Sequence, residues 1–280
     1  MNYGPPRRIE SWGRVVRPLQ EIAQPCFREQ LPRLMAARSK QSVLPTGLYR
    51  SYGDSNLNTS GQLIDMSRLD RVIAFDLANG ILRAEAGLSL GEVLRLTVPH
   101  GWFLKTTPGT RFVSLGGAVA NDVHGKNHHS VGSFGNCVRC IGLVRSDGTE
   151  VTLSPENNAD LFSATIGGLG LTGAIVWVEI ELAPIASSDL EVERIPFGNI
   201  GDFFALSIEA KDSHEHTVAW VDCASTRQSL GRGIFQRANW SQSGQLCPHS
   251  SATRMTVPFE APITPLNRIT VKLFNEVYYR

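Results

Sequence analysis

Residues 116–135 read GGAVANDVHGKNHHSVGSFG, and this stretch decides how the N-terminal part of the chain is interpreted. Three of the chain's seven histidines, His124, His128 and His129, lie within six positions here. The small residues before them leave bare backbone that a ligand can approach closely, because glycine has no side chain and tolerates positive φ. The stretch therefore indicates a metal site, a catalytic base cluster or a loop that binds a ligand.

A metal site is the weakest of these interpretations. His124 and His128 have i, i+4 spacing, but Gly125 between them would cost a helix about 1 kcal/mol, and the glutamate of an H-E-x-x-H pattern is missing. Cys137-x-x-Cys140 is half of a zinc pattern, and no second pair follows at a suitable spacing. The sequence therefore predicts no metal.

A base is the stronger candidate, because imidazole titrates near neutral pH and can take a proton from a substrate hydroxyl. We expect His124 to line an active site, with Lys126 and Asn127 positioning the loop or a substrate phosphate. A solvated surface loop remains the alternative, particularly for Lys126 and for the other two histidines of the stretch.

Glycine is concentrated with small polar residues in four segments of the same region, residues 45–54, 108–117, 121–135 and 167–173. Turns of this composition present backbone N–H groups that can cradle a pyrophosphate. The letters G-x-G-x-x-G occur at 168–173, but they lead into a strand instead of a helix, so the dinucleotide fingerprint fails. No P-loop pattern is present.

Turn chemistry predicts antiparallel hairpins. Apolar segments 72–77 and 81–87 flank Asn79-Gly80, and CIGLVRS and TEVTLS flank Asp147-Gly148; both dipeptides tolerate the backbone of tight turns. Strand 174–182 places its alternate residues on one apolar face and is ended by Pro184.

Helices are fewer than strands. Ser89 and Glu92 predict a capping box at the start of a helix that runs to about residue 98, and a short helix is expected at 32–38. Helices and strands alternate without a regular βαβ rhythm, which indicates an α+β fold.

The sequence predicts two domains, residues 1–184 and 185–280. A proline-marked break precedes a new strand-then-helix pattern near residue 185, and residues 239–255 are polar enough for a long loop. The chain stops at FNEVYYR in an apolar stretch, so we expect the second domain to be truncated.

Composition excludes several classes of partner and membrane segment. The 27 basic and 26 acidic residues give a net charge of +1, which does not favour nucleic acid. No apolar run reaches the roughly 18 residues of a spanning helix, and the N-terminus lacks the apolar stretch of a signal peptide. Five cysteines fit a reduced compartment. The expected location is the cytoplasm, with peripheral membrane contact and the periplasm left open.

The glycine-rich segments resemble the FAD-linked oxidases of the vanillyl-alcohol-oxidase type. GLYRSYGDSNLN (47–58) resembles their first pyrophosphate loop, PGTRFVSLGGAVANDVHGKNHHSVGSFG (108–135) the second flavin segment, and DLFSATIGGLGLTGAIV (160–176) the third mark. WGR (12–14) and VAWVDCASTRQSLGRG (218–233) add to the likeness and make it most similar to members that oxidise a polyprenylphosphoryl ribose.

The resemblance implies a PCMH-type FAD-binding domain of two α+β subdomains, followed by a substrate domain. It assigns FAD contacts to Pro45, Thr46, Gly47, Leu48, Tyr49, Arg50, Ser51, Tyr52, Gly53, Asp54, Ser55, Gly109, Thr110, Ser114, Leu115, Gly116, Gly117, Asn121, Val123, His124 and Ile175. Relatives with covalent flavin carry histidine in a G-x-x-H-S pattern, where this chain has Arg50, so non-covalent FAD is expected.

The implied reaction is oxidation of a secondary alcohol of a sugar, such as the 2′-hydroxyl of a polyprenylphosphoryl ribose, to a ketone, with His124 and Lys126 as catalytic candidates. A soluble aldose, alditol or aldonolactone is the alternative substrate, and an FAD-binding protein without turnover is the alternative class. The resemblance also implies catalytic lysine and tyrosine residues beyond Arg280 and a separate short-chain reductase as partner. Oxygen, a quinone or another carrier would accept the electrons.

Overall fold

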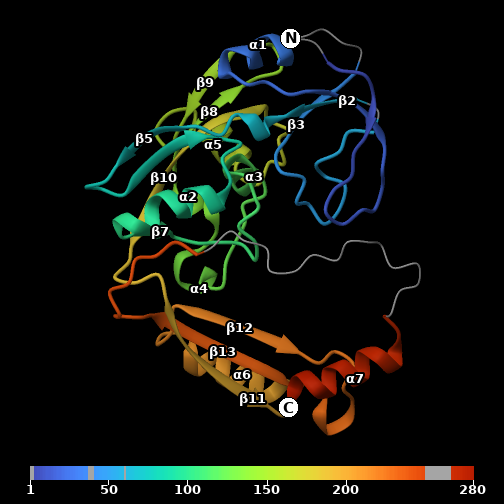
Figure 1. The fold of residues 1–280 in the computed structure, drawn as a ribbon, viewed down its shortest axis with the longest axis vertical. Coiled ribbons are helices and arrows are strands. Elements are labelled where there is room, and N and C mark those ends of the chain that lie inside the picture. The colour runs from blue at the N-terminus through green and yellow to red at the C-terminus, as the bar shows by residue number, and fades with distance from the viewer. Residues whose placement is uncertain (1–2, 37–40, 60, 250–265) are drawn as a thin grey trace. The chain divides into compact units, whose positions relative to one another are not determined.

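The structure, a computed structural model, describes residues 3–36, 41–59, 61–249 and 266–280 (Figure 1). The chain divides into two compact units, Met1–Ile185 and Ala186–Arg280. This division lies one residue after the boundary expected from the sequence. The mixture of helices and sheets confirms the predicted α+β class.

The first sheet of the N-terminal unit has the strand order β1-β2-β4-β3 and contains both parallel and antiparallel pairs. Its elements are β1 (Arg7–Arg8), β2 (Leu19–Ala23), β3 (Val43–Thr46) and β4 (Gln62–Asp65), with the short helices η1 (Arg28–Gln30), α1 (Leu31–Met35) and η2 (Met66–Arg68). Pro32 lies in the first turn of α1, as expected. The helix ends at Met35, before the predicted end, and residues 37–38 lie outside the described part of the chain.

The second sheet has the order β5-β6-β10-β8-β9, and β7 also pairs with β10. Its strands are β5 (Val72–Asp76), β6 (Ile81–Glu85), β7 (Trp102–Leu104), β8 (Val138–Val144), β9 (Glu150–Leu153) and β10 (Ala174–Pro184). Both predicted hairpins form, and Gly80 and Gly148 adopt positive φ in their turns. The apolar face predicted for β10 is buried at Val176, Val178, Ile180 and Leu182.

Helices and the second sheet together enclose the larger hydrophobic core. The helices that contribute buried residues to this core are α2 (Leu90–Thr97), α3 (Leu115–Ala120), η4 (Phe134–Cys137) and α5 (Ala159–Thr165), whereas η3 (Val98–His100) and α4 (His128–Val131) contribute none. Ser89 caps α2 by accepting a hydrogen bond from the backbone N–H of Glu92 at 3.1 Å. The Glu92 carboxylate bonds Arg95 on the same helix, so only half of the expected capping box forms.

The C-terminal unit is an antiparallel sheet in the order β11-β13-β12 with α6 packed on it. Its elements are β11 (Leu190–Phe197), α6 (Ile200–Ala210), β12 (His216–Val221), η5 (Arg227–Ser229), β13 (Gly233–Trp240) and α7 (Arg268–Tyr279). The strand-then-helix pattern predicted after residue 185 is therefore confirmed. Residues 239–240 of the predicted loop belong to β13, and residues 250–255 lie outside the described part.

Buried polar side chains fix α7 within this unit. Asp222, only 3% exposed, accepts hydrogen bonds from Asn275 at 2.6 Å and from Arg232 at 3.2 Å. Arg232 also bonds Glu276 at 2.6 Å, and its guanidinium lies 4.6 Å from the ring centre of Tyr279. Each buried polar group of this network has a partner, as stable interiors require.

No helix among the described residues has the length and apolar character needed to cross a membrane.

Candidate functional site

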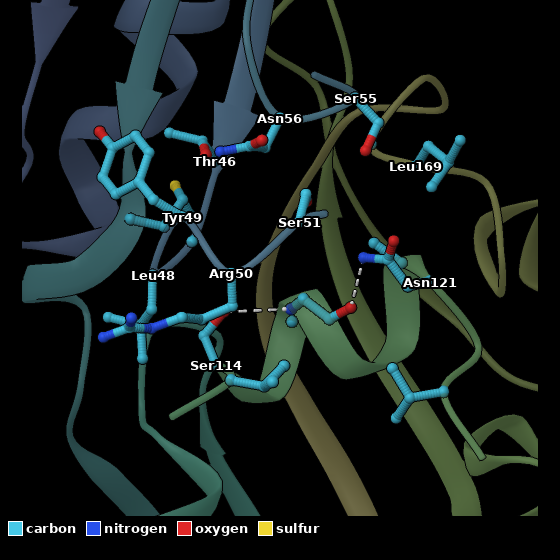
Figure 2. Close-up of a pocket in the computed structure, with 18 of the residues that line it drawn as sticks. Thr46, Leu48, Tyr49, Arg50, Ser51, Ser55, Asn56, Ser114, Asn121 and Leu169 are labelled. Atoms are coloured by element: carbon cyan, nitrogen blue, oxygen red, sulfur yellow. Dashed lines mark hydrogen bonds between the residues drawn. The ribbon is translucent and has the colours of Figure 1, made fainter. Parts of the chain in front are cut away.

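The N-terminal unit contains a cavity of about 350 Å³, formed where the glycine-rich segments meet (Figure 2). Residues of the 45–56 loop, the 108–123 segment and the 169–175 turn line it, together with Met66 and Ala86. The lining residues are Pro45, Thr46, Gly47, Leu48, Tyr49, Arg50, Ser51, Tyr52, Ser55, Asn56, Met66, Ala86, Pro108, Gly109, Thr110, Val113, Ser114, Gly116, Gly117, Ala120, Asn121, Val123, Leu169, Gly170, Gly173 and Ile175. Three segments far apart in the sequence thus form one cavity.

Most residues predicted to contact a cofactor line this cavity. The exceptions are Gly53, Asp54, Leu115 and His124. Leu115 is fully buried in the hydrophobic core, because α3 turns it away from its neighbours Ser114 and Gly116. Gly53, Asp54 and His124 are exposed.

The backbone of the first loop, residues 47–55, is arranged for binding an anion. In the part of the chain that the structure describes, none of its N–H groups donates a hydrogen bond, whereas the carbonyls of Tyr49 and Ser51 accept bonds from Trp12 at 2.9 Å and Gly13 at 3.3 Å. Tyr49 has a φ of 56°, in the region that non-glycine residues rarely adopt. A run of N–H groups without internal acceptors is the arrangement that phosphate-binding loops use.

Three side chains on the cavity wall, those of Thr46, Tyr49 and Asn56, carry buried polar atoms without hydrogen-bond partners among the described residues. Thr46 is 3% exposed and its hydroxyl is unpaired, and both amide atoms of Asn56 are shielded from solvent and unpaired. Figure 2 shows both residues among those lining the cavity. An unpaired buried polar group costs about 1–3 kcal/mol, so these atoms fit a polar ligand that would satisfy them.

The hydroxyl of Tyr49 is buried close to Asp65. Burial, followed by the charge of the Asp65 carboxylate, raises the pKa of this hydroxyl. Asp65 is itself held by the backbone N–H of Ser67 at 3.0 Å and by Gln24 at 3.2 Å. The phenol is therefore neutral at physiological pH and available as a hydrogen-bond donor.

The second segment contributes close backbone packing. The Ser114 hydroxyl caps α3 by accepting a hydrogen bond from the N–H of Gly117 at 3.2 Å, and the N–H of Gly116 bonds the carbonyl of Ala86 at 2.8 Å. A Cβ atom added to Gly47 would collide with the Ser114 hydroxyl, so a larger residue at this position would displace the group that caps α3.

The third segment, which contains the G-x-G-x-x-G letters, is a turn that precedes β10 and is hydrogen-bonded to α3. Gly170 and Gly173 have positive φ and line the cavity. The backbone N–H of Gly167 bonds the carbonyl of Val119 at 3.0 Å, and that of Leu169 bonds Ala120 at 2.8 Å. The structure thus confirms that these letters lead into a strand, and gives them a place on the cavity wall.

The histidine loop begins where the cavity wall ends at Val123. His124 pairs through its backbone with Ser133, and its ring centre lies 5.6 Å from that of His128. The predicted positioning residue Asn127 is 3% exposed: its amide donates to the carbonyl of Lys105 at 2.8 Å and accepts from Thr106 at 3.1 Å. The loop is therefore anchored by Asn127, whereas His124 and Lys126 are exposed.

The three histidines do not form a metal centre in the structure. Within the described ranges, no three His, Cys, Asp or Glu side chains are grouped so that they could hold an ion. His128 uses its Nδ1 for a hydrogen bond of 3.1 Å with the carbonyl of Gly125. All five cysteines have free thiols. Burial raises the pKa of Cys137 to about 12, so this thiol is inert.

Sequence reasoning missed several residues of the cavity. Asn56 lies one residue past the predicted contact range, inside the loop that was already singled out. Leu169, Gly170 and Gly173 belong to the third segment, to which only one contact was assigned. For Met66 and Ala86 the local sequence carries no signal.

Comparison with known proteins agrees with this geometry. Residues 23–154 match the family described as FAD binding domain. The chain is 32% identical to decaprenylphosphoryl-beta-D-ribose oxidase of Mycolicibacterium smegmatis, over 98% of this chain and 62% of that protein. It is 30% identical to L-gulonolactone oxidase of Mus musculus over 45% of this chain and 28% of that protein, and 29% identical to Delta(24)-sterol reductase of Homo sapiens over 42% and 23%.

The matched range contains the first two cavity segments, and the third lies beyond it, after α5. The chain spans about 62% of the length of the mycobacterial relative. The unpaired N–H groups of the first loop, the shielded atoms of Thr46 and Asn56, and the glycine contacts all fit a cofactor with a pyrophosphate and many polar edges. Residues 23–154 are thus similar to an FAD binding domain, and nearly the whole chain is similar to an oxidase.

Proposed function

We propose that the chain binds FAD non-covalently in the cavity of its N-terminal unit and serves the oxidation of a secondary alcohol of a sugar, the 2′-hydroxyl of a polyprenylphosphoryl ribose. The observation that carries the cofactor site is the first loop, whose N–H groups donate no hydrogen bond within the described chain. The substrate class is supported by the 32% identity to an oxidase named for decaprenylphosphoryl ribose.

The side chain of Arg50 supports the non-covalent attachment. It occupies the position at which relatives with covalent flavin carry histidine, and its guanidinium lies 5.6 Å from the ring centre of Phe112. None of the described residues that line the cavity is a histidine. FAD would then be released intact when the protein is denatured.

In this proposal, one set of residues holds the cofactor and another contacts the substrate. When bound, FAD supplies the two-electron acceptor for the alcohol carbon. The first loop holds the pyrophosphate through its N–H groups, and α3 and the third segment supply the close backbone walls. The exposed imidazole of His124, directly after the cavity residue Val123, takes the proton of the substrate hydroxyl, and Lys126 meets the substrate phosphate.

A soluble sugar lactone is the second candidate substrate, because the chain is also similar to L-gulonolactone oxidase of Mus musculus, over 45% of its length, and to putative D-arabinono-1,4-lactone oxidase of Neurospora crassa, over 55%. In the preferred reading, a separate short-chain reductase would reduce the ketone to the opposite epimer. That partner is part of the proposal and rests on the family resemblance alone.

The test is anaerobic reduction of the FAD-loaded protein. A polyprenylphosphoryl ribose should bleach the flavin absorbance at about 450 nm, and the ketone should appear in equal amount. Bleaching by gulonolactone or an alditol instead would favour the second candidate, and bleaching by neither would leave FAD binding without turnover. His124→Ala should slow bleaching about 100-fold or more while FAD remains bound; unchanged bleaching would remove His124 from the reaction.

A further inference from the structure

The backbone of the first loop accepts hydrogen bonds from a segment outside the matched FAD binding domain. Trp12 and Gly13 precede the matched range, which begins at residue 23. The N–H of Trp12 bonds the carbonyl of Tyr49 at 2.9 Å, and the N–H of Gly13 bonds the carbonyl of Ser51 at 3.3 Å. Two alternate carbonyls of the loop are therefore fixed in one direction.

Fixing these carbonyls also fixes the N–H groups that follow them. In a planar trans peptide the C=O of one residue and the N–H of the next point in opposite directions, and no described peptide bond is cis. The N–H groups of Arg50 and Tyr52 must therefore point away from Trp12 and Gly13. Both residues line the cavity, and neither N–H donates a hydrogen bond in the described chain.

Packing shows that this contact is close and needs glycine. A Cβ atom on Gly13 would overlap the backbone carbonyl of Tyr52. The ring of Trp12 meets that of Tyr52 edge-on, with 5.5 Å between the centres. By contrast, a Cβ atom on Gly4, in the same N-terminal stretch, would find its nearest neighbour at 3.5 Å, an ordinary contact.

We propose that Trp12 and Gly13 are positioning residues that turn the N–H groups of Arg50 and Tyr52 into the cavity, where they donate hydrogen bonds to the cofactor's pyrophosphate. The proposal rests on the proposed FAD site. It adds that the site is incomplete without a segment that the FAD binding domain match does not include.

The first experiment measures FAD affinity by titrating the flavin-free full chain and following flavin fluorescence. Gly13→Ala should raise the Kd by at least about tenfold, the value of one hydrogen bond to a charged group, because the new methyl group displaces the loop. Trp12→Ala keeps both N–H groups and should raise it about threefold through loss of the ring contact. Gly4→Ala is the matched control and should leave the Kd unchanged. Equal affinity of Gly13→Ala and wild type would overturn the proposal.

The second experiment needs no variant and covers the case in which Gly13→Ala does not fold. Hydrogen exchange is followed at the amides of Arg50 and Tyr52 in the wild-type chain. These amides should exchange rapidly without cofactor and become at least about tenfold slower with FAD, because a hydrogen-bonded amide is protected. Unchanged exchange on FAD binding would overturn the proposal. Failure of the chain to bind FAD would remove the cofactor site itself, whereas failure to oxidise a sugar would leave this result untouched.

Discussion

Two asparagine side chains, one in each unit, have buried amide atoms but differ in hydrogen bonding. Asn275 in α7 donates to Asp222 at 2.6 Å and belongs to a network in which Arg232 also has its partners. Asn56 on the cavity wall has an amide whose nitrogen and oxygen are both shielded from solvent, and neither atom has a partner in the described chain. Since unpaired buried groups cost stability, the network within the C-terminal unit explains Asn275, whereas a polar ligand in the cavity would explain Asn56.

Replacement of Arg232 should lower the stability of the C-terminal unit more than any other change to the network around Asp222. Arg232→Met would leave Asp222, whose side chain is 4% exposed, without its cationic partner. We expect the free energy of unfolding of the C-terminal unit to fall by about 3 kcal/mol, toward the lower end for a broken buried pair because Asn275 still donates. Chemical denaturation measures it. A loss below about 1 kcal/mol would mean that the Arg232–Asp222 pair contributes no more to stability than a surface ion pair.

Replacement of the paired amide should cost less. Asn275→Leu keeps the branched shape of the side chain but removes the donor to Asp222, so a loss of about 1–3 kcal/mol is expected by the same measurement. FAD affinity should not change, because Asn275 belongs to the other unit and the cavity lies within the first. Weaker FAD binding in this variant would contradict the separation of the two roles.

The stability of the C-terminal unit at acidic pH should also depend on this network. Burial alone would raise the pKa of Asp222, but hydrogen bonds from Asn275, the N–H of Ala224 and Arg232 together lower it below its ordinary value of 3.8. A lowered pKa stabilises the folded state above pH 3.8, and this stabilisation disappears as the pH falls through the folded-state pKa. Asn275→Leu should therefore shift the acid unfolding midpoint to higher pH, as followed by tryptophan fluorescence. An unchanged midpoint would mean that the amide does not hold the carboxylate ionised.

The features that could be predicted from the sequence are those determined by residues that are close together in the chain. Asn79-Gly80 and Asp147-Gly148 specify hairpins by themselves, and the alternation in β10 specifies which face is buried. The first loop could also be recognised, because its glycines and small polar residues are contiguous. Each of these signals spans fewer than a dozen residues.

What the sequence could not supply depends on contacts between distant segments. Leu115 was expected at the cofactor, yet α3 turns it into the core, because the phase of so short a helix is set by Ala86 and Leu88, whose carbonyls accept its first N–H groups. The contacts of Trp12 and Gly13 with the first loop cross more than 30 positions. Nothing near WGR in the sequence indicates which carbonyls it binds.

The unpaired amide provides the final test, in which stability and binding should move in opposite directions. Asn56→Leu removes two polar atoms that no described residue satisfies, so the flavin-free chain should be as stable as wild type or slightly more stable. FAD should bind about tenfold more weakly, because the cofactor loses one hydrogen-bonding side chain. The matched comparison is Asn275→Leu, the same change at a paired amide, for which we expect lower stability with unchanged binding. If Asn56→Leu instead destabilises the flavin-free chain and leaves FAD affinity unchanged, Asn56 is a structural residue like Asn275, and the contrast between the two amides fails.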